Sequence, residues 1–131
     1  MSFLSAAKLA INLNKTQEEI LSLLSKSFCA TPWRAEAIHA AALYLRNNSQ
    51  IGLSYLIAKS GLDIPMPMNS LFVCRAVYEY SLLDEFAVAA YHAGKFGECR
   101  DACIKLLNSK KLPAHSIERV TKNLRFCDGK T

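Results

Sequence analysis

The fold class of this chain follows from residues 89–99, which read Ala89-Ala90-Tyr91-His92-Ala93-Gly94-Lys95-Phe96-Gly97-Glu98-Cys99. Gly94 separates two helix-forming segments, and glycine readily adopts the left-handed backbone conformation that a tight turn needs. An aromatic residue stands on each side of this turn, and the small side chain of Cys99 allows the two helices to touch. The stretch therefore predicts a helical hairpin, with helices over 82–93 and 97–108.

Similar helical signals occur along the rest of the chain. Thr16 precedes Glu19 by three residues, which is the capping-box pattern of a helix start. Thr31-Pro32 indicates another start, with proline in the first turn, and Gly61 indicates a helix end. We expect about eight helices, over 3–13, from Thr16, from Thr31, and over 50–60, 71–80, 82–93, 97–108 and 114–126.

The helix expected from Thr31 has apolar residues on most of its circumference, which predicts neighbours on both sides. One of its stripes is Trp33, Ala37, Ala40, Ala41 and Tyr44. The connections between the expected helices are short, and no segment has the pattern of a strand. The sequence predicts an all-α protein, a short α-solenoid of antiparallel helical hairpins that forms a single domain over residues 1–131.

Charge and cysteine content limit the classes of function. Residues 1–94 carry seven Lys/Arg and seven Asp/Glu, whereas residues 95–131 carry nine against four, so the net charge of +5 lies in the last quarter. The five cysteines are an odd number and form no Cys-x-x-Cys motif, which favours reduced thiols and a cytoplasmic protein. No secretion signal and no apolar run of about 20 residues is present, so we expect no membrane association.

Catalytic and metal-binding groups are sparse in the sequence. Cys99 and Cys103 stand four apart on one expected helix and, with His92 and Cys127, are candidates for zinc binding. However, both cysteines fall on an apolar stripe, where reduced cysteine behaves as a small hydrophobic residue. The chain has no glycine-rich phosphate loop, and no histidine or carboxylate stands out as a base for a nucleophile. We expect no enzyme activity, no cofactor and no metal.

A binding surface is easier to predict. His39 and Arg46 line up with Ala35 and Ala42 on the third expected helix, and Asp84 and Tyr91 share a side of the helix over 82–93. First helices of successive hairpins line the concave groove of helical-repeat proteins. His39, Arg46, Asp84 and Tyr91 could then hold a peptide or a segment of a protein partner. Equally, these side chains could be solvated or fill gaps between helices.

The final expected helix is the second candidate surface. Its inward stripe is Ile117, Val120, Leu124 and Cys127, which leaves Phe126 on the outer face with Arg119 and Lys122. An aromatic residue among basic residues is a typical contact point, so we predict contact with another chain or domain, or self-association, through Phe126. The alternative is that the helix frays after Leu124 and Phe126 folds back onto the core.

Two stretches resemble tetratricopeptide repeats. One is residues 89–99, and the other runs from Arg34-Ala35-Glu36-Ala37 to Ser54-Tyr55-Leu56-Ile57-Ala58-Lys59-Ser60-Gly61-Leu62-Asp63-Ile64-Pro65. The equivalent small residues, Ser54 and Cys99, lie 45 apart instead of the usual 34 or so, so the repeats are degenerate.

Residues 30–127 also resemble the tetratricopeptide-like helical segments that accompany bacterial glycosyltransferases. The short segments that match are Arg34-Ala35-Glu36, Ala58 to Pro65, Leu71-Phe72-Val73, Val77-Tyr78-Glu79, Leu83-Asp84-Glu85, Ala90-Tyr91 and Asn123-Leu124-Arg125-Phe126. The resemblance implies a helical docking module accessory to a glycosyltransferase domain. It implies no transferase activity, because the chain lacks an Asp-x-Asp motif and a nucleotide-binding α/β unit.

Nucleic-acid binding by the basic C-terminal region is the alternative function. The last expected helix carries Arg119, Lys122 and Arg125 on its outer face. The sequence shows neither a helix-turn-helix signature nor aromatic residues interleaved with these cations. The sequence therefore favours a protein or peptide as the partner over a nucleic acid.

Overall fold

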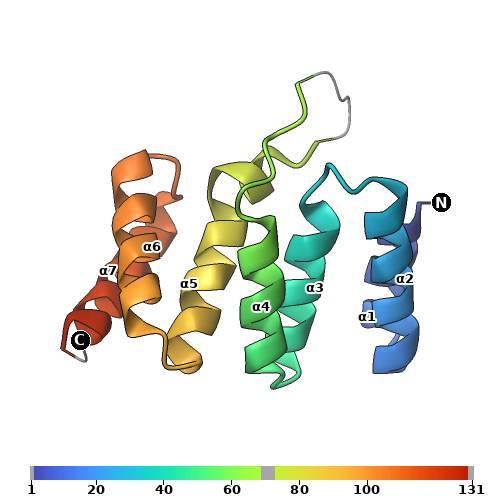
Figure 1. Cartoon of the computed structure of the whole chain (residues 1–131), viewed down its shortest axis with the longest axis horizontal. Coiled ribbons are helices and arrows are strands. Elements are labelled where there is room, and N and C mark those ends of the chain that lie inside the picture. Colours follow the sequence, from blue (N-terminus) through green and yellow to red (C-terminus); the bar gives the residue numbers. More distant parts are fainter. Residues whose placement is uncertain (1, 69–72, 130–131) are drawn as a thin grey trace.

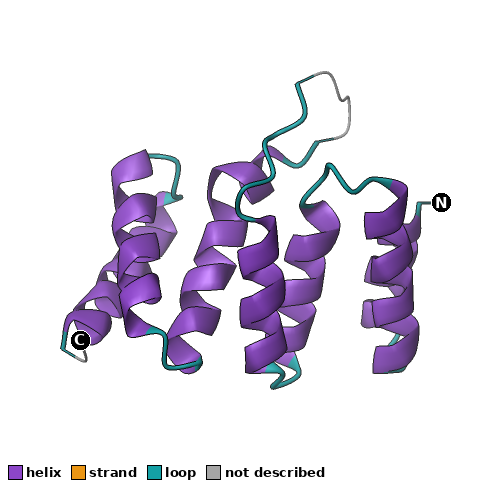
Figure 2. Ribbon diagram, in the orientation of Figure 1, coloured by secondary structure: helices purple, strands orange, loops and turns teal. Residues whose placement is uncertain are grey.

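The computed structural model describes residues 2–68 and 73–129, and all regular structure within these ranges is helical (Figure 2). The α-helices described there are α1 (Phe3–Asn12), α2 (Gln17–Ala30), α3 (Glu36–Asn47), α4 (Ile51–Gly61), α5 (Leu82–His92), α6 (Phe96–Ser109) and α7 (Ala114–Asp128). A π-helical turn, η1 (Val77–Ser81), leads directly into α5. The all-α prediction is confirmed for this part of the chain. None of these helices is long and apolar enough to span a lipid bilayer.

Each α-helix packs against the next one in the chain, and α4 packs against α5 although the loop after α4 and the turn η1 separate them in sequence (Figure 1). The odd-numbered helices also contact one another in order, α1 with α3, α3 with α5, and α5 with α7. An ion pair joins Asp84 to Arg119, and a ring contact joins Tyr91 to Phe126 about two turns further along both helices. Helices α5 and α7 therefore run parallel.

The buried residues form two clusters. The larger one draws on helices α3 to α7, and the smaller one lies among α1, α2 and α3 around Ile20 and Leu24. Many members are alanines, which lets helices approach closely. Cys99, Cys103 and Cys127 are fully buried in the larger cluster, so the prediction that Cys99 and Cys103 are core residues is confirmed.

Local signals placed two of the helix boundaries correctly. The Thr16 hydroxyl accepts a hydrogen bond from the Glu19 amide at 3.2 Å, as expected for the cap of α2. Gly94 has a φ of +80° and forms the predicted turn between α5 and α6. Lys110 follows α6 in the left-handed conformation and ends that helix.

The predicted start of the third helix at Thr31-Pro32 is wrong. Thr31 instead ends α2, because its amide and its hydroxyl both donate hydrogen bonds back to the Ser27 carbonyl. Helix α3 begins only at Glu36, and the Ala35 amide before it donates to the hydroxyl of Tyr78 at 2.9 Å. Trp33 therefore lies in the connection, is 61% exposed, and does not belong to the apolar stripe.

Gly61 is the last residue of α4, as predicted, but it does not end the helix as a left-handed C-cap glycine. Its backbone is not in the left-handed region that a glycine stop uses. A Cβ atom at this position would instead lie 2.8 Å from Cγ2 of Ile38 and 3.1 Å from Cδ2 of Leu82. Glycine is needed there because α3 and the start of α5 pack directly against the end of α4.

The helix predicted over 71–80 is not separate from the one over 82–93. Residues 69–72 lie outside the described ranges, and from Arg75 onward the chain is helical without a break through η1 into α5. Insertions of a π-helical turn are rare and interrupt the regular period of a helix. This irregularity made one helix look like two in the sequence.

The apolar stripe predicted for the last helix is covered only in part. Val120 and Cys127 are buried and Leu124 is partly buried, but Ile117 is 45% exposed. Helix α7 packs on α6 and more lightly on α5, and it has no following helix in the described chain. Ile117 therefore remains outside the core.

Candidate binding site on the odd-numbered helices

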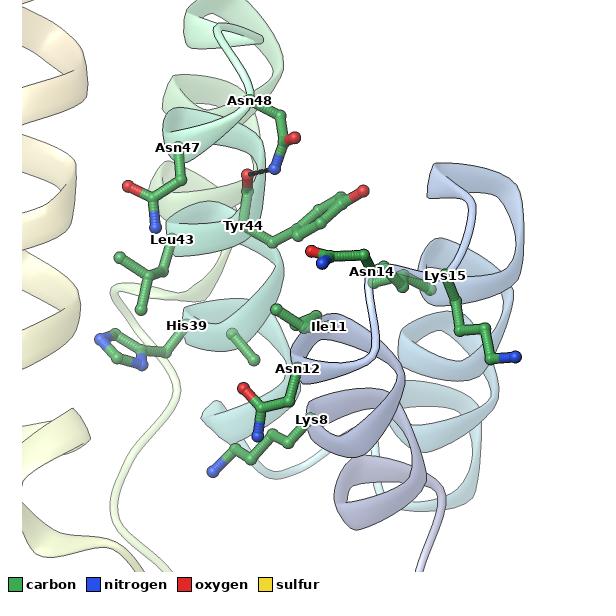
Figure 3. Close-up of a pocket in the computed structure, with 12 residues that line it drawn as sticks. Lys8, Ile11, Asn12, Asn14, Lys15, His39, Leu43, Tyr44, Asn47 and Asn48 are labelled. Carbon is green, nitrogen blue, oxygen red and sulfur yellow. Dashed lines mark hydrogen bonds between the residues drawn. The ribbon is translucent and has the colours of Figure 1, made fainter.

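A pocket of about 670 Å³ lies between α1, the connection to α2, and α3 (Figure 3). We call it the α1–α3 pocket, and it is lined by Lys8, Ile11, Asn12, Asn14, Lys15, Ile20, His39, Ala40, Leu43, Tyr44, Asn47 and Asn48. Figure 3 shows Lys8 and Asn12 projecting from α1, and His39, Leu43 and Asn47 from α3. Asn14 lies beside the Tyr44 ring, and the Lys15 side chain extends away from that ring. Apolar and polar side chains both line this pocket, and concave sites of small-molecule and peptide ligands combine the two in the same way.

The polar side of the α1–α3 pocket is cationic. Two lysines, one histidine and four asparagines line it, and no aspartate or glutamate does. The side chains of Lys8, Lys15 and Asn12 make no hydrogen bond or ion pair with any residue of the described ranges. Lysine ammonium groups and amide N–H groups are hydrogen-bond donors, so the pocket presents several uncommitted donors to a ligand.

Charges of both signs act on His39. Burial lowers the pKa of the His39 imidazole, and the nearby Lys8 ammonium lowers it further, against the opposing effect of Glu85 and Asp84. Lys8 and His39 both line the pocket. An anion bound between them would face both a fixed positive charge and a neutral imidazole that can become protonated.

Two of the predicted binding residues are already occupied within the chain. Arg46 of α3 makes two hydrogen bonds to the Glu85 carboxylate, at 2.7 and 3.0 Å, and so joins α3 to α5. Asp84 accepts two hydrogen bonds from Arg119, at 3.0 and 2.5 Å, and so joins α5 to α7. Bidentate pairs of this kind fix geometry strongly. Arg46 and Asp84 hold the odd-numbered helices together instead of facing a ligand freely.

Tyr91 and Phe126, the other two predicted residues of these helices, meet in a group of rings. Tyr91 contacts His92, Phe96 and Phe126 with ring centroids 5.3, 5.6 and 6.3 Å apart, and we call these four residues the aromatic cluster. Phe126 is 55% exposed, so it is not buried in the core, but its face of α7 is turned partly toward α5, where Arg119 pairs with Asp84. Its contact with Tyr91 was not predicted. The fifth predicted residue, His39, lines the α1–α3 pocket and is not part of the aromatic cluster.

The sequence reasoning did not identify the α1 side of the pocket. Lys8 interrupts an apolar stretch and Asn12 follows it four residues later, so both lie on one face of α1. This i, i+4 pair of polar residues could have indicated a polar face on α1. Its significance depends on His39 and Asn47, which the fold brings beside it from far along the chain.

A buried polar network at the start of α3 was also not predicted. Glu36 accepts hydrogen bonds from Arg34 at 2.6 Å, from the Cys74 amide at 3.2 Å, and from the Tyr78 hydroxyl. Burial by itself raises the pKa of the Glu36 carboxyl, but these hydrogen bonds outweigh it and lower the pKa overall. The network ties the segment after the long loop to α3, and every member is satisfied internally, so we assign it a structural role.

The three buried cysteines lie close to one another. The Sγ atoms of Cys99 and Cys103 are 4.0 Å apart, and burial raises the pKa of Cys127 to about 12. Within residues 2–68 and 73–129, no three His, Cys, Asp or Glu side chains are arranged to hold a metal ion. A buried thiol with a raised pKa is a poor nucleophile and a poor metal ligand.

Among known proteins, no family model, no curated protein and no solved structure matches this chain. Similarity to other proteins therefore gives no information about its ligands or partners.

Proposed function

We propose that this protein is a helical-repeat interaction module that binds an acidic segment of a partner protein in the α1–α3 pocket. The observation behind this proposal is that Lys8, Lys15 and Asn12 line a pocket without any carboxylate and have no partner within the described chain. Carboxylates of a partner would supply the missing acceptors. Hydrogen bonds between charged groups are among the stronger ones that proteins form.

The contrast with the rest of the odd-numbered helices supports this assignment. Arg46 and Arg119 each hold a carboxylate of their own chain, so their charges are already neutralised locally. Lys8 and Lys15 have no such carboxylate. The positive potential at the pocket would therefore steer an acidic segment toward it.

The architecture that fits this role is a short α-solenoid of tetratricopeptide type. Its support is the succession of antiparallel hairpins and the order in which α1, α3, α5 and α7 contact one another. Ser54 of α4 and Cys99 of α6, the small residues equated between the two repeats, are both fully buried. Helical-repeat proteins bind extended partners on such a layer of first helices.

The resemblance over residues 30–127 suggests a glycosyltransferase domain as the partner. This chain would then be an accessory to that domain, without catalysis of its own. The neighbouring coding sequence checks this part of the proposal. A glycosyltransferase domain encoded in the same chain or directly beside it is the expected finding, and unrelated neighbours in several genomes would contradict it.

The binding proposal is tested with an array of synthetic 15-residue peptides grouped as acidic, neutral and basic. We expect the purified protein to retain acidic peptides selectively, and Lys8→Ala to weaken the best of them about tenfold or more, since a hydrogen bond between charged groups contributes about 1.5–3 kcal/mol. Lys26→Ala is the matched control, because Lys26 is an exposed lysine of α2 that does not line the pocket. Equal binding by the two variants, or no preference for acidic peptides, would overturn the proposal.

A further inference from the structure

We propose that the aromatic cluster, together with the exposed basic residues beside it, is a stacking site for single-stranded nucleic acid. These basic residues are Lys95, Lys122 and Arg125. The site lies on α5, α6 and α7, and it is distinct in residues and in chemistry from the α1–α3 pocket.

The fold assembles rings that the sequence keeps apart. Tyr91 comes from the end of α5, Phe96 from the first turn of α6, and Phe126 from the end of α7. Their planes are inclined to that of Tyr91 by 71° and 47°, so the rings do not stack face to face on one another. With Phe126 more than half exposed, a planar ligand can reach a ring face. Bases of every type stack on such faces.

Exposed lysine and arginine side chains stand beside these rings. Lys122 precedes Phe126 by four residues and shares its side of α7, and Arg125 is adjacent to it. Neither side chain makes a hydrogen bond or ion pair with the described residues, whereas Arg119 on the same helix is held by Asp84. Lys95 lies on the turn directly before Phe96. Phosphates that follow a stacked base would meet these charges.

Other occupants fit these observations less well. A second copy of the chain would bring Lys95, Lys122 and Arg125 against the same three charges, which costs free energy. A partner protein normally inserts an anchoring side chain into a pocket. Four pockets within residues 2–68 and 73–129 are lined by side chains outside the aromatic cluster. An exposed aromatic surface flanked by cations suits a flat, negatively charged polymer instead.

The test is fluorescence anisotropy with labelled 12-nucleotide oligo(dT) and oligo(U) in 50 mM salt. We expect Phe126→Ala to weaken binding about fivefold or more, which is the loss typical of one stacked base. The control is Trp33→Ala, which removes a similarly exposed aromatic residue elsewhere and should leave binding unchanged. Replacing Lys122 and Arg125 together by Gln should lower the slope of log Kd against log salt by about 1.4, because each phosphate contact to a single strand contributes about 0.7. The charge-matched control replaces Lys105 and Lys111, which are exposed and outside the site.

Three results would overturn this inference. The first is the absence of oligonucleotide binding in 50 mM salt. The second is equal binding by Phe126→Ala and Trp33→Ala, which would leave only non-specific charge attraction. The third is equally tight binding of poly-glutamate with the same dependence on Phe126, which would identify the site as one for an acidic protein segment. Loss of the acidic-peptide preference in Lys8→Ala bears only on the α1–α3 pocket, so the two proposals fail separately.

Discussion

Replacing Gly61 by alanine should destabilise this protein, although alanine is the better helix former. The new Cβ would lie 2.8 Å from Cγ2 of Ile38, 3.1 Å from its Cδ1, and 3.1 Å from Cδ2 of Leu82. Real Cβ atoms essentially never approach to 2.8 Å, so either α4 or these two buried side chains must shift. Overpacking of this kind costs about 1–3 kcal/mol. The gain in helix propensity is at most about 1 kcal/mol, so the net effect is a loss of stability.

Two other glycines of the chain provide matched controls. Gly52 in α4 and Gly97 in α6 have no atom within 4 Å of the position where a Cβ would be. At both positions alanine adds helix propensity without a clash, so each substitution should be neutral or stabilise by up to about 1 kcal/mol. Urea unfolding followed by circular dichroism at 222 nm measures all three variants on the same scale.

The cause of the Gly61 effect can be isolated in the background of Ile38→Ala. Removing the Ile38 side chain eliminates the closest contact, so adding Gly61→Ala there should cost less than in the wild type. The difference between the two costs is the coupling free energy between the positions. A stabilised Gly61→Ala variant, or an equal cost in both backgrounds, would refute the close packing of α3 against α4 at this point.

Two further predictions concern buried groups. Cys99→Leu should destabilise more than Cys99→Ala, because Cys99 is fully buried against Cys103 and added volume overpacks by about 1–3 kcal/mol; equal urea midpoints would contradict this. The pKa of the Glu36 carboxyl is lowered in the folded protein, so the ionised carboxylate stabilises the fold. This stabilisation is complete above the unfolded-state pKa near 4.5 and is lost as the pH falls toward the folded-state pKa. Glu36→Gln should therefore be less stable than the wild type at pH 7, and the difference should shrink at pH 4. A difference that is constant between these pH values would show that the carboxylate charge is not involved.

Local sequence determined the helices and most of their boundaries. The turn at Gly94 and the cap at Thr16 were predicted correctly, because both depend on residues within one turn of each other. The burial of Cys99 and Cys103 was also predictable, since a period of four residues on an apolar helix face marks the core. The exposure of Phe126 followed from the same geometry, but its contact with Tyr91 did not.

Tertiary structure decided the features that depend on distant partners. Thr31-Pro32 has the local pattern of a helix start, yet Thr31 bonds back to α2, while the Ala35 amide before α3 donates to Tyr78 from far along the chain. The role of Gly61 depends on Ile38 and Leu82, neither of which is its neighbour in sequence.

The candidate binding sites depend on tertiary structure in the same way. Arg46 and Asp84 looked available in the sequence, but the packing of α3, α5 and α7 pairs them with Glu85 and Arg119. Conversely, the Lys8 side of α1 gained its significance only when α3 placed His39 beside it. Helix periodicity is a local property that a sequence displays directly, whereas the availability of a charge depends on which carboxylate the fold brings within reach.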